Sequence, residues 1–221
     1  MMKQLNKTNL GWLILIALMV VVLFVGVSSN VISPFYQITL VTILINVILA
    51  IGLNLVIGFS GQFSLGHAGF MAIGAYSGAI IGDKIEGLPG FFAGLFVGMF
   101  ISIVVALIVG IPTLRLKGDY LAIATLGVAE IIRILILNMG DLTNGARGIS
   151  GISFPFESNM SFIMVLFLIV IVTSIITINY IHSSPGRATI AIREDEIAAE
   201  SMGVNATTYK VIAFMIGAAT A

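Results

Sequence analysis

The sequence predicts an all-α protein, a polytopic bundle of transmembrane helices forming a single domain over residues 1–221. The 221 residues are 59% hydrophobic and only 9% charged, whereas a soluble domain carries about 25% charged residues. The apolar residues also form runs close to the roughly 20 that a helix needs to cross a bilayer. These runs are too long and too uniformly apolar for the strands of a transmembrane barrel. We expect about six complete spanning helices and the start of a seventh.

The expected spans follow one another along the chain with short polar connections. The first has lysines ahead of it but is longer than the apolar part of a cleaved signal peptide, so we expect a retained helix. The seventh begins near Thr207 and is still apolar at Ala221, so we expect that the chain is truncated inside this helix. The six complete spans are predicted at residues 10–27, 36–58, 65–82, 91–111, 120–138 and 160–181.

Lysine and arginine are divided unevenly between the two sides of this arrangement. Because cytoplasmic loops of membrane proteins are enriched in these residues, we predict a multi-pass protein of the bacterial inner membrane with a cytoplasmic N-terminus. Its third segment then spans, since a re-entrant one would place Arg115 and Lys117 outside. The outer side holds Lys84 and Arg147, and the cytoplasmic side holds Lys3, Lys7, Arg115, Lys117, Arg187, Arg193 and Lys210.

Glycines recur at every fourth position in the third and fourth spans. Small residues at this spacing line one helix face and let neighbouring backbones approach closely. We therefore predict tight helix packing, with a pore wall as the alternative. The six glycines are Gly74, Gly78, Gly82, Gly90, Gly94 and Gly98.

Residues 58–69, G-F-S-G-Q-F-S-L-G-H-A-G, combine four polar side chains with glycines between two apolar spans. One interpretation is a capped turn in which Ser64 is the N-cap of the third span. The other is a helix break whose free backbone groups line a polar path, as in broken transporter helices. The polar residues are Ser60, Gln62, Ser64 and His67.

The fifth span contains two opposite charges, Glu130 and Arg133, and a threonine, Thr125. A charge at mid-bilayer costs about 2.5–3.5 kcal/mol on insertion scales. Three residues apart on a helix, the two charges can pair. The alternative is a polar face turned toward a cavity or another subunit. Together with the four polar residues above, these three form the candidate translocation path.

The cytoplasmic stretch 182–210 is long and has the sequence features of two short helices. Ser184 followed by Pro185 suits an N-cap and first helical position, and the acids at 194–196 suit the start of a second helix. Gly203 can end that helix, and Asn205 can cap the next. Its apolar residues have no bilayer to enter, so we expect them to need a groove on a partner: Ile192, Ile197, Ala198, Ala199 and Met202. The alternative is a loop lying back on its own bundle.

Several classes of site are absent from the sequence. There are no cysteines and only two histidines, without metal-ligand spacing. The net charge is zero, so no overall field points to nucleic acid. No nucleotide-binding loop of the G-x-x-x-x-G-K-[ST] type occurs. We expect no catalytic residues, metal or cofactor on this chain. The outer loop 140–156 is either a turn-rich connection or part of a gate or partner contact.

Four ordered motifs resemble the permeases of bacterial branched-chain amino-acid ABC importers. GLNLVIGFSGQFSLGHAGF (52–70) resembles the family as a whole, and RLKGDYLAIATLGVAEIIR (115–133) is similar to its M-type subunit rather than the H-type paralogue. LTNGARGISGI (142–152) and GRATIAIREDEIAAESMGVN (186–205) fit the same subunit. The resemblance runs from about residue 44 to the end. Family members continue for several more helices.

The resemblance implies a permease that moves Leu, Ile and Val inward while separate ATPases hydrolyse ATP. The implied partners are an H-type permease, two cytoplasmic ABC ATPases, a periplasmic or lipid-anchored amino-acid-binding protein and membrane lipid. Residues 182–210 then resemble the ATPase-coupling element, whose pattern is E-A-A, three residues, then Gly. Ile197 stands where that glutamate would be. The implied coupling residues are Gly186, Arg187, Arg193, Glu194, Asp195, Glu196, Ala198, Ala199 and Gly203.

Two other functions stay open from the sequence. M-type permeases for urea or short-chain amides are similar in these motifs, because selectivity rests first on the binding protein. An ion-coupled secondary transporter would need intramembrane acids, and only Glu130 qualifies. It would also leave the cytoplasmic helices without a role.

Overall fold

The computed structural model describes residues 33–221 except 115, 117, 153–154 and 157, and these residues form helices and connections without strands. The predicted span at 10–27, with Lys3 and Lys7, lies outside the described residues, as do Arg115 and Lys117. The elements in order are α2 (Pro34–Asn54), the π-helix η1 (Leu55–Phe59), α3 (His67–Lys84), α4 (Leu88–Thr113), α5 (Asp119–Asn138), α6 (Gly140–Thr143), the 3₁₀-helix η2 (Gly145–Arg147), α7 (Asn159–His182), α8 (Ser184–Glu194), α9 (Glu196–Ser201) and α10 (Ala206–Ala219).

Four helices in the described part of the chain are long and apolar enough to cross a membrane: α2 with η1, α4, α5 and α7. They lie at the positions predicted for four of the spans, so the polytopic helical bundle is confirmed. The predicted third span is present as α3 but is not among the four, because its 18 residues include polar groups at both ends. α10 is a shorter apolar helix.

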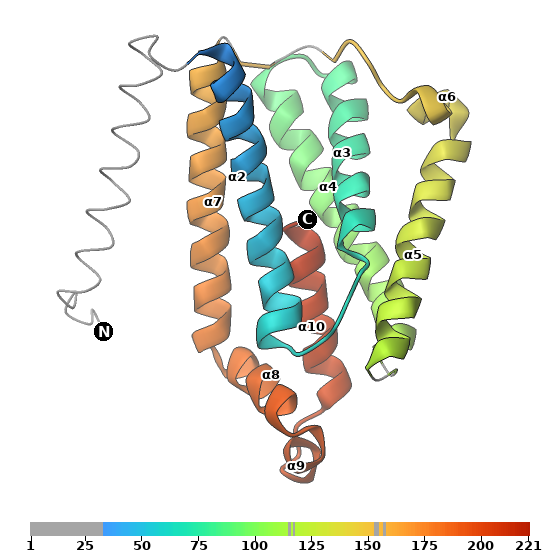
Figure 1. The fold of residues 1–221 in the computed structure, drawn as a ribbon, viewed down its shortest axis with the longest axis vertical. Helices are drawn as coiled ribbons and strands as arrows, with labels where there is room; N and C mark the ends of the chain where they lie inside the picture. The colour runs from blue at the N-terminus through green and yellow to red at the C-terminus, as the bar shows by residue number, and fades with distance from the viewer. Residues whose placement is uncertain (1–32, 115, 117, 153–154, 157) are drawn as a thin grey trace, which may run out of the picture.

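The helices stand roughly side by side, as Figure 1 shows. α2 packs along α7, α3 along α4, and α10 lies against α4. α5 stands at one edge and contacts mainly α3. Helices α8 and α9 project from one end of the bundle, and α6 lies at the other. The main core joins η1, α3, α4, α5 and α10 through the buried residues Val56, Phe70, Ala106, Leu114, Leu121, Val211, Phe214 and Ala218.

Glycines allow α3 and α4 to approach closely. A Cβ added to Gly94 would lie 2.8 Å from the Cα of Gly78, and one added to Gly98 would lie 3.1 Å from the Cα of Gly74. These distances leave no room for a side chain on α4 at either position. Gly82 and Gly90 do not form a third pair of this kind. A Cβ added to Gly90 would instead lie 1.8 Å from the carbonyl oxygen of Ile85, and one added to Gly82 would meet nothing within 4 Å.

The connection from α5 to α7 is anchored by an aromatic cluster. Phe156 is buried, and its ring centroid lies 5.2 Å from that of Phe91 in α4 and 5.0 Å from that of Phe162 in α7. Edge-to-face and tilted ring pairs at this separation are favourable. The loop therefore packs on the bundle at the end opposite α8 and α9.

Candidate functional site

The chain breaks its helical path after α2 and re-enters a helix only at His67. The last turn of α2 widens into η1, where the Ser60 amide donates to the Leu55 carbonyl at 3.1 Å. Gly61 then turns the chain with a positive φ of 67°, a conformation that glycine adopts without steric cost. Residues 61–66 are irregular, and α3 begins well inside the bundle rather than level with the end of η1 (Figure 1). Residues 60–66 thus form an irregular connection between two helices of opposite direction, and we call this segment the helix break.

Side chains alternate along this segment between the interior and the surface. Ser60, Gln62 and Ser64 are buried, whereas Phe63 and Leu65 are exposed. The polar side chains of the segment thus point inward and the apolar ones outward. This inversion suits a protein whose outer surface contacts lipid, because the interior then takes the polar groups.

The buried polar side chains bond to other helices rather than capping α3. Gln62 Nε2 donates to the Lys210 carbonyl at 3.0 Å and to the Ser60 hydroxyl. The Leu65 amide donates to Thr125 Oγ1 at 3.0 Å, and Thr125 is itself buried in α5. Gln62 Oε1 is buried and has no hydrogen-bond partner among the described residues.

The predicted N-cap of α3 is wrong. Ser64 Oγ accepts from the Gly66 amide at 3.3 Å, but the cap position is Gly66, which has no side chain to offer. Ser64 lies two residues too early because the chain is still irregular through Gly66. His67, the first residue of α3, is half-buried, and its Nε2 lies 3.1 Å from the Leu49 carbonyl. The histidine thus ties α3 to α2.

Glu130 and Arg133 form the predicted ion pair on α5. Arg133 Nε donates to Glu130 Oε2 at 2.8 Å, and Nη2 donates to Oε1 at 2.5 Å. Their side chains are 51% and 60% exposed, respectively. The structure therefore brings Ser60, Gln62, Ser64 and Thr125 together in the interior but leaves this pair on the outer face of α5.

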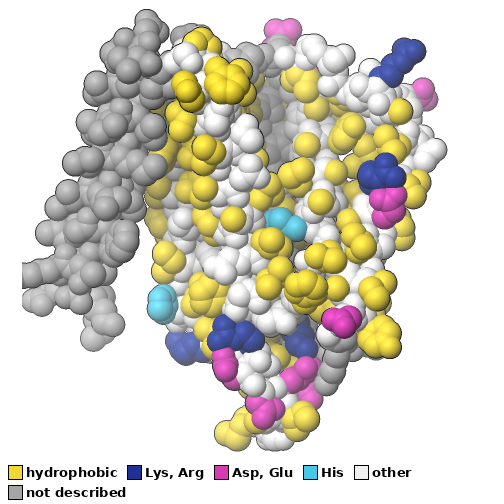
Figure 2. Space-filling view, in the orientation of Figure 1, with side chains coloured by type: hydrophobic (Ala, Val, Ile, Leu, Met, Phe, Trp, Pro, Cys, Tyr) yellow, Lys and Arg dark blue, Asp and Glu magenta, His cyan; other side chains and the backbone are white. Residues whose placement is uncertain are grey.

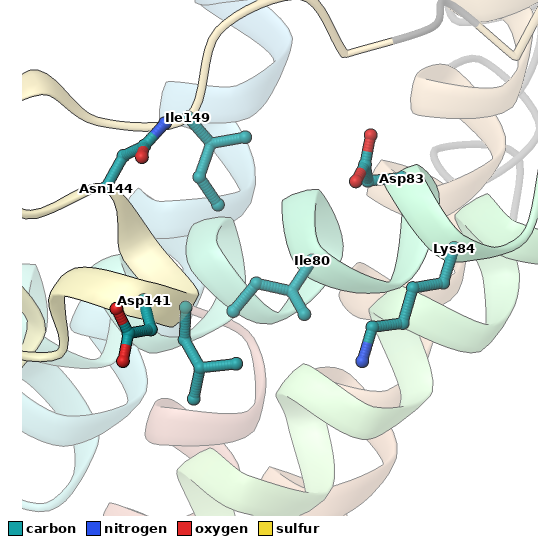
Figure 3. Close-up of a pocket in the computed structure, with 7 residues that line it drawn as sticks. Ile80, Asp83, Lys84, Asp141, Asn144 and Ile149 are labelled. Carbon is teal, nitrogen blue, oxygen red and sulfur yellow. The ribbon is translucent and has the colours of Figure 1, made fainter.

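A hollow of about 230 Å³ lies at the end of the bundle away from α8 and α9. Figure 3 shows Asp141 and Lys84 on opposite sides of Ile80 in this hollow. Its charged side chains are exposed, unlike the buried polar groups of residues 60–66. The lining residues are Ile80, Asp83, Lys84, Asp141, Leu142, Asn144 and Ile149.

The two predicted cytoplasmic helices are α8 and α9, and their caps explain where they begin and end. The N-cap of α8 is Ser183, whose hydroxyl accepts from the Gly186 amide at 3.2 Å. The expected N-cap, Ser184, is the first helical residue instead. Asp195 caps α9 by accepting from the Ala198 amide at 3.0 Å. After α9, Gly203 has a φ of 84°, and its amide donates to the Glu200 carbonyl.

Three contacts fix the remaining geometry of this element. An added Cβ at Gly186 would lie 1.9 Å from the Tyr180 carbonyl oxygen, so only glycine lets α8 fold back against the end of α7. Asn205 accepts from the Thr208 amide at 3.1 Å and caps α10, as predicted. Arg187 Nη1 donates to the His182 carbonyl at 2.7 Å.

The apolar residues of this element face two ways. Ile192 and Ala199 are buried in a cluster with Ala206, so the expectation that they need a partner is wrong. They pack on the same chain because α10 begins directly beneath them. Ile197 and Met202 are 74% and 85% exposed, respectively. Figure 2 shows that charged side chains gather over this end of the molecule.

Two side chains link this element to the rest of the bundle. Arg193 Nη1 donates to the Gly58 carbonyl at 2.7 Å and also pairs with Glu194. Lys210 Nζ lies 2.8 Å from Glu196 Oε1, which joins α10 to α9. Neither link could be read from the sequence, because Gly58 is 135 residues from Arg193. A contact between residues this far apart in the chain produces no motif or periodicity in the sequence.

The apolar helices of spanning length characterise a multi-pass membrane protein with a polar segment inside the bundle and a helical element at one end. The family described as "Branched-chain amino acid transport system / permease component" matches residues 35–221. The chain belongs to this family.

Two curated relatives agree with the family. The chain is 38% identical to the high-affinity branched-chain amino acid transport system permease protein LivM of Salmonella typhimurium strain LT2, and 37% identical to LivM of Escherichia coli strain K12. Each match covers 80% of this chain and 48% of the relative. The chain thus spans about half the length of these relatives. No solved structure matches it.

Proposed function

We propose that the chain is the membrane-spanning permease part of an ABC importer that moves leucine, isoleucine and valine into the cytoplasm. The observation that carries this proposal is the 38% identity to a branched-chain amino acid permease protein, together with the family match over residues 35–221. ATP would be hydrolysed on separate chains. The chain itself would supply helices whose rearrangement opens a path alternately to each side.

The cytoplasmic element is proposed to receive the movement of the ATPases. Ile197 and Met202 project from α9, and exposed apolar side chains of this kind fit a groove on a partner. The acids Glu194, Asp195 and Glu196 lie at the start of α9 and would contribute to the polar rim of the contact. The proposed orientation places this end, and the N-terminus, in the cytoplasm.

The buried polar segment is proposed to border the path of the solute. Ser60, Gln62, Ser64 and Thr125 bring hydroxyl and amide groups into the bundle interior, where the amino and carboxyl groups of an amino acid would otherwise meet hydrocarbon. His67 lies at the end of this segment. Glu130 and Arg133 would face the H-type permease or the path between the two subunits.

The binding protein, the second permease and two ATPases complete the proposed importer. Selection of the solute would begin on the binding protein outside the membrane. In this chain, the alternation between states would be carried by α8 and α9 moving relative to α3, α4 and α5. The helix break after α2 lies where those parts meet.

Uptake of labelled leucine into proteoliposomes tests this proposal. The full-length protein would be reconstituted with the partners encoded beside it, with ATP inside and the binding protein outside. We expect accumulation that requires both ATP and the binding protein. ATP-dependent uptake of urea or an amide instead would replace the solute, and uptake of any solute without ATP would overturn the ABC importer.

A further inference from the structure

Helix α8 is joined directly to the helix break. Arg193 Nη1 donates to the Gly58 carbonyl at 2.7 Å. A Cβ added to Gly61 would lie 2.6 Å from Cγ of the same arginine. The break therefore packs on both the charged end and the aliphatic stem of one side chain from α8.

Helix α9 is joined to the same break through α10. Glu196 in α9 pairs with Lys210 in α10, with side chains only 27% and 14% exposed, respectively. The backbone carbonyl of Lys210 accepts from Gln62 Nε2 at 3.0 Å. Lys210 thus contacts α9 through its side chain and Gln62 through its backbone carbonyl. A displacement of α9 would therefore reach the interior through a short route of two contacts.

The helix break also contacts α5 and continues directly into α3. The Leu65 amide donates to Thr125 Oγ1 in α5 at 3.0 Å, and an added Cβ at Gly66 would lie 3.1 Å from the Thr125 carbonyl oxygen. The segment then runs into α3 at His67. Movement of residues 60–66 would thus act on α3 and α5 together.

Two features of η1 and residues 60–66 are typical of a segment that can adopt more than one backbone conformation. A π-helical turn holds one extra residue and is frequent at functional sites. Gln62 Oε1 is buried without a hydrogen-bond partner among the described residues, a costly condition that a change of register could relieve. Transmission between distant sites requires an element with discrete arrangements that both ends can bias.

We propose that Gln62 is a positioning residue that transmits movement of α8 and α9 to residues 60–66, and through them to α3 and α5. This inference rests on the proposed function and deepens it, since it names the route by which a cytoplasmic partner acts on the interior. The route runs from Glu196 through its ion pair to Lys210 and from the Lys210 carbonyl to Gln62. The hydrogen bond from Arg193 to the Gly58 carbonyl supports it.

The first experiment separates transmission from contact with the solute. Gln62→Met keeps the length of the side chain but removes both hydrogen bonds, and Gln37→Met makes the same change near the start of α2. In the reconstituted importer, ATP hydrolysed per leucine imported should rise about fivefold for Gln62→Met, the ratio that corresponds to one net hydrogen bond of about 1 kcal/mol. The KM for leucine and the Gln37→Met ratio should stay unchanged.

An unchanged ratio for Gln62→Met would overturn the proposal. A changed KM at a constant ratio would do the same, since it would place Gln62 in contact with the solute instead. If the Gln62→Met protein does not assemble, the second experiment decides.

The second experiment follows the segment itself. Glu196→Gln removes the charge that holds Lys210, and Glu200→Gln makes the same change on the exposed side of α9. Amide hydrogen exchange in peptides covering residues 60–66 of the full transporter should become about fivefold faster for Glu196→Gln only, by the same hydrogen-bond argument. Equal exchange in the two variants would refute the route. This comparison does not depend on the solute, so an importer without ATP-dependent uptake would refute the proposed function separately.

Discussion

Helices α4 and α5 are both long and apolar enough to span a membrane, but they pack in the molecule differently. One face of α4 is buried at every fourth residue, by Gly90, Gly94, Gly98, Ser102, Ala106 and Gly110. In α5 an equal share of the span is buried, but its buried residues Leu121, Ala122, Thr125 and Ile132 do not recur at every fourth position. Small residues let α3 and α10 reach the backbone of α4, whereas two of the four buried residues of α5, Leu121 and Ile132, are large. Hydropathy thus indicates which helices can span, and the spacing of small residues indicates which pack within the chain.

The same division separates the two faces of the element formed by α8 and α9. Ile192 and Ala199 are covered by α10, while Ile197 and Met202 are not covered by any described residue. The outward face of α9 and the outward face of α5, with its Glu130–Arg133 pair, are therefore the two surfaces on which partners are proposed. The following variants test whether the inward and outward positions differ as the structure indicates.

A strong destabilisation is expected from a change at the contact between α3 and α4. Gly94→Leu would force a side chain against the Gly78 backbone, and overpacking of this kind costs about 1–3 kcal/mol or more. Gly127→Leu makes the same change on α5, where an added Cβ meets nothing within 4 Å. We expect a clearly lower melting temperature in detergent for Gly94→Leu and little change for Gly127→Leu. Equal losses would show that the two helices do not differ in packing.

A second pair of variants compares the two faces of α8 and α9. Ile192→Ala empties a buried position and should destabilise the folded chain by about 2–5 kcal/mol. Ile197→Ala changes an exposed position, where substitutions alter stability by about 0.5 kcal/mol or less. Thermal unfolding should distinguish them, and only Ile197→Ala should weaken copurification of the ATPases while leaving the melting temperature unchanged. Undiminished ATPase binding would remove α9 from the proposed contact.

The turn after α9 should be sensitive to its backbone. Proline cannot adopt the φ of 84° seen at Gly203 and has no amide to donate to Glu200. We expect Gly203→Pro to abolish leucine uptake while membrane insertion, measured by protease protection, stays intact, because the residue lies outside the spanning helices. Normal uptake by this variant would exclude a coupling role for the turn.

The smallest effect is expected at the ion pair of α5. Removing either charge leaves the other unpaired in an apolar surrounding, so Glu130→Gln and Arg133→Gln should each reduce the amount of protein inserted. The double variant removes both charges and should insert better than either single variant. Quantitative immunoblotting of membranes measures this. A double variant no better than the singles would mean that the two residues act independently.

Much of the fold follows from local sequence. The helices at 34–54, 88–113, 119–138 and 159–182 lie within a few residues of the predicted spans because a long apolar run is an unambiguous signal for a spanning helix. Gly203 and Asn205 end and begin helices as predicted, since φ above zero and side-chain capping are properties of single residues. The predictions at Ser64 and Ser184 were each displaced from the true cap, because a neighbouring residue decided where the helix began.

The sequence by itself therefore determined that this is a helical membrane protein, where most of its helices lie and which family it belongs to, because composition, run length and motif order are carried by neighbouring residues. The tertiary structure decided which polar groups are inside. The burial of Gln62, the hold of Arg193 on Gly58 and the bond between Glu196 and Lys210 depend on helices that meet only after folding. Contacts between residues far apart in the chain leave no periodic pattern, so only the packed helices could show them.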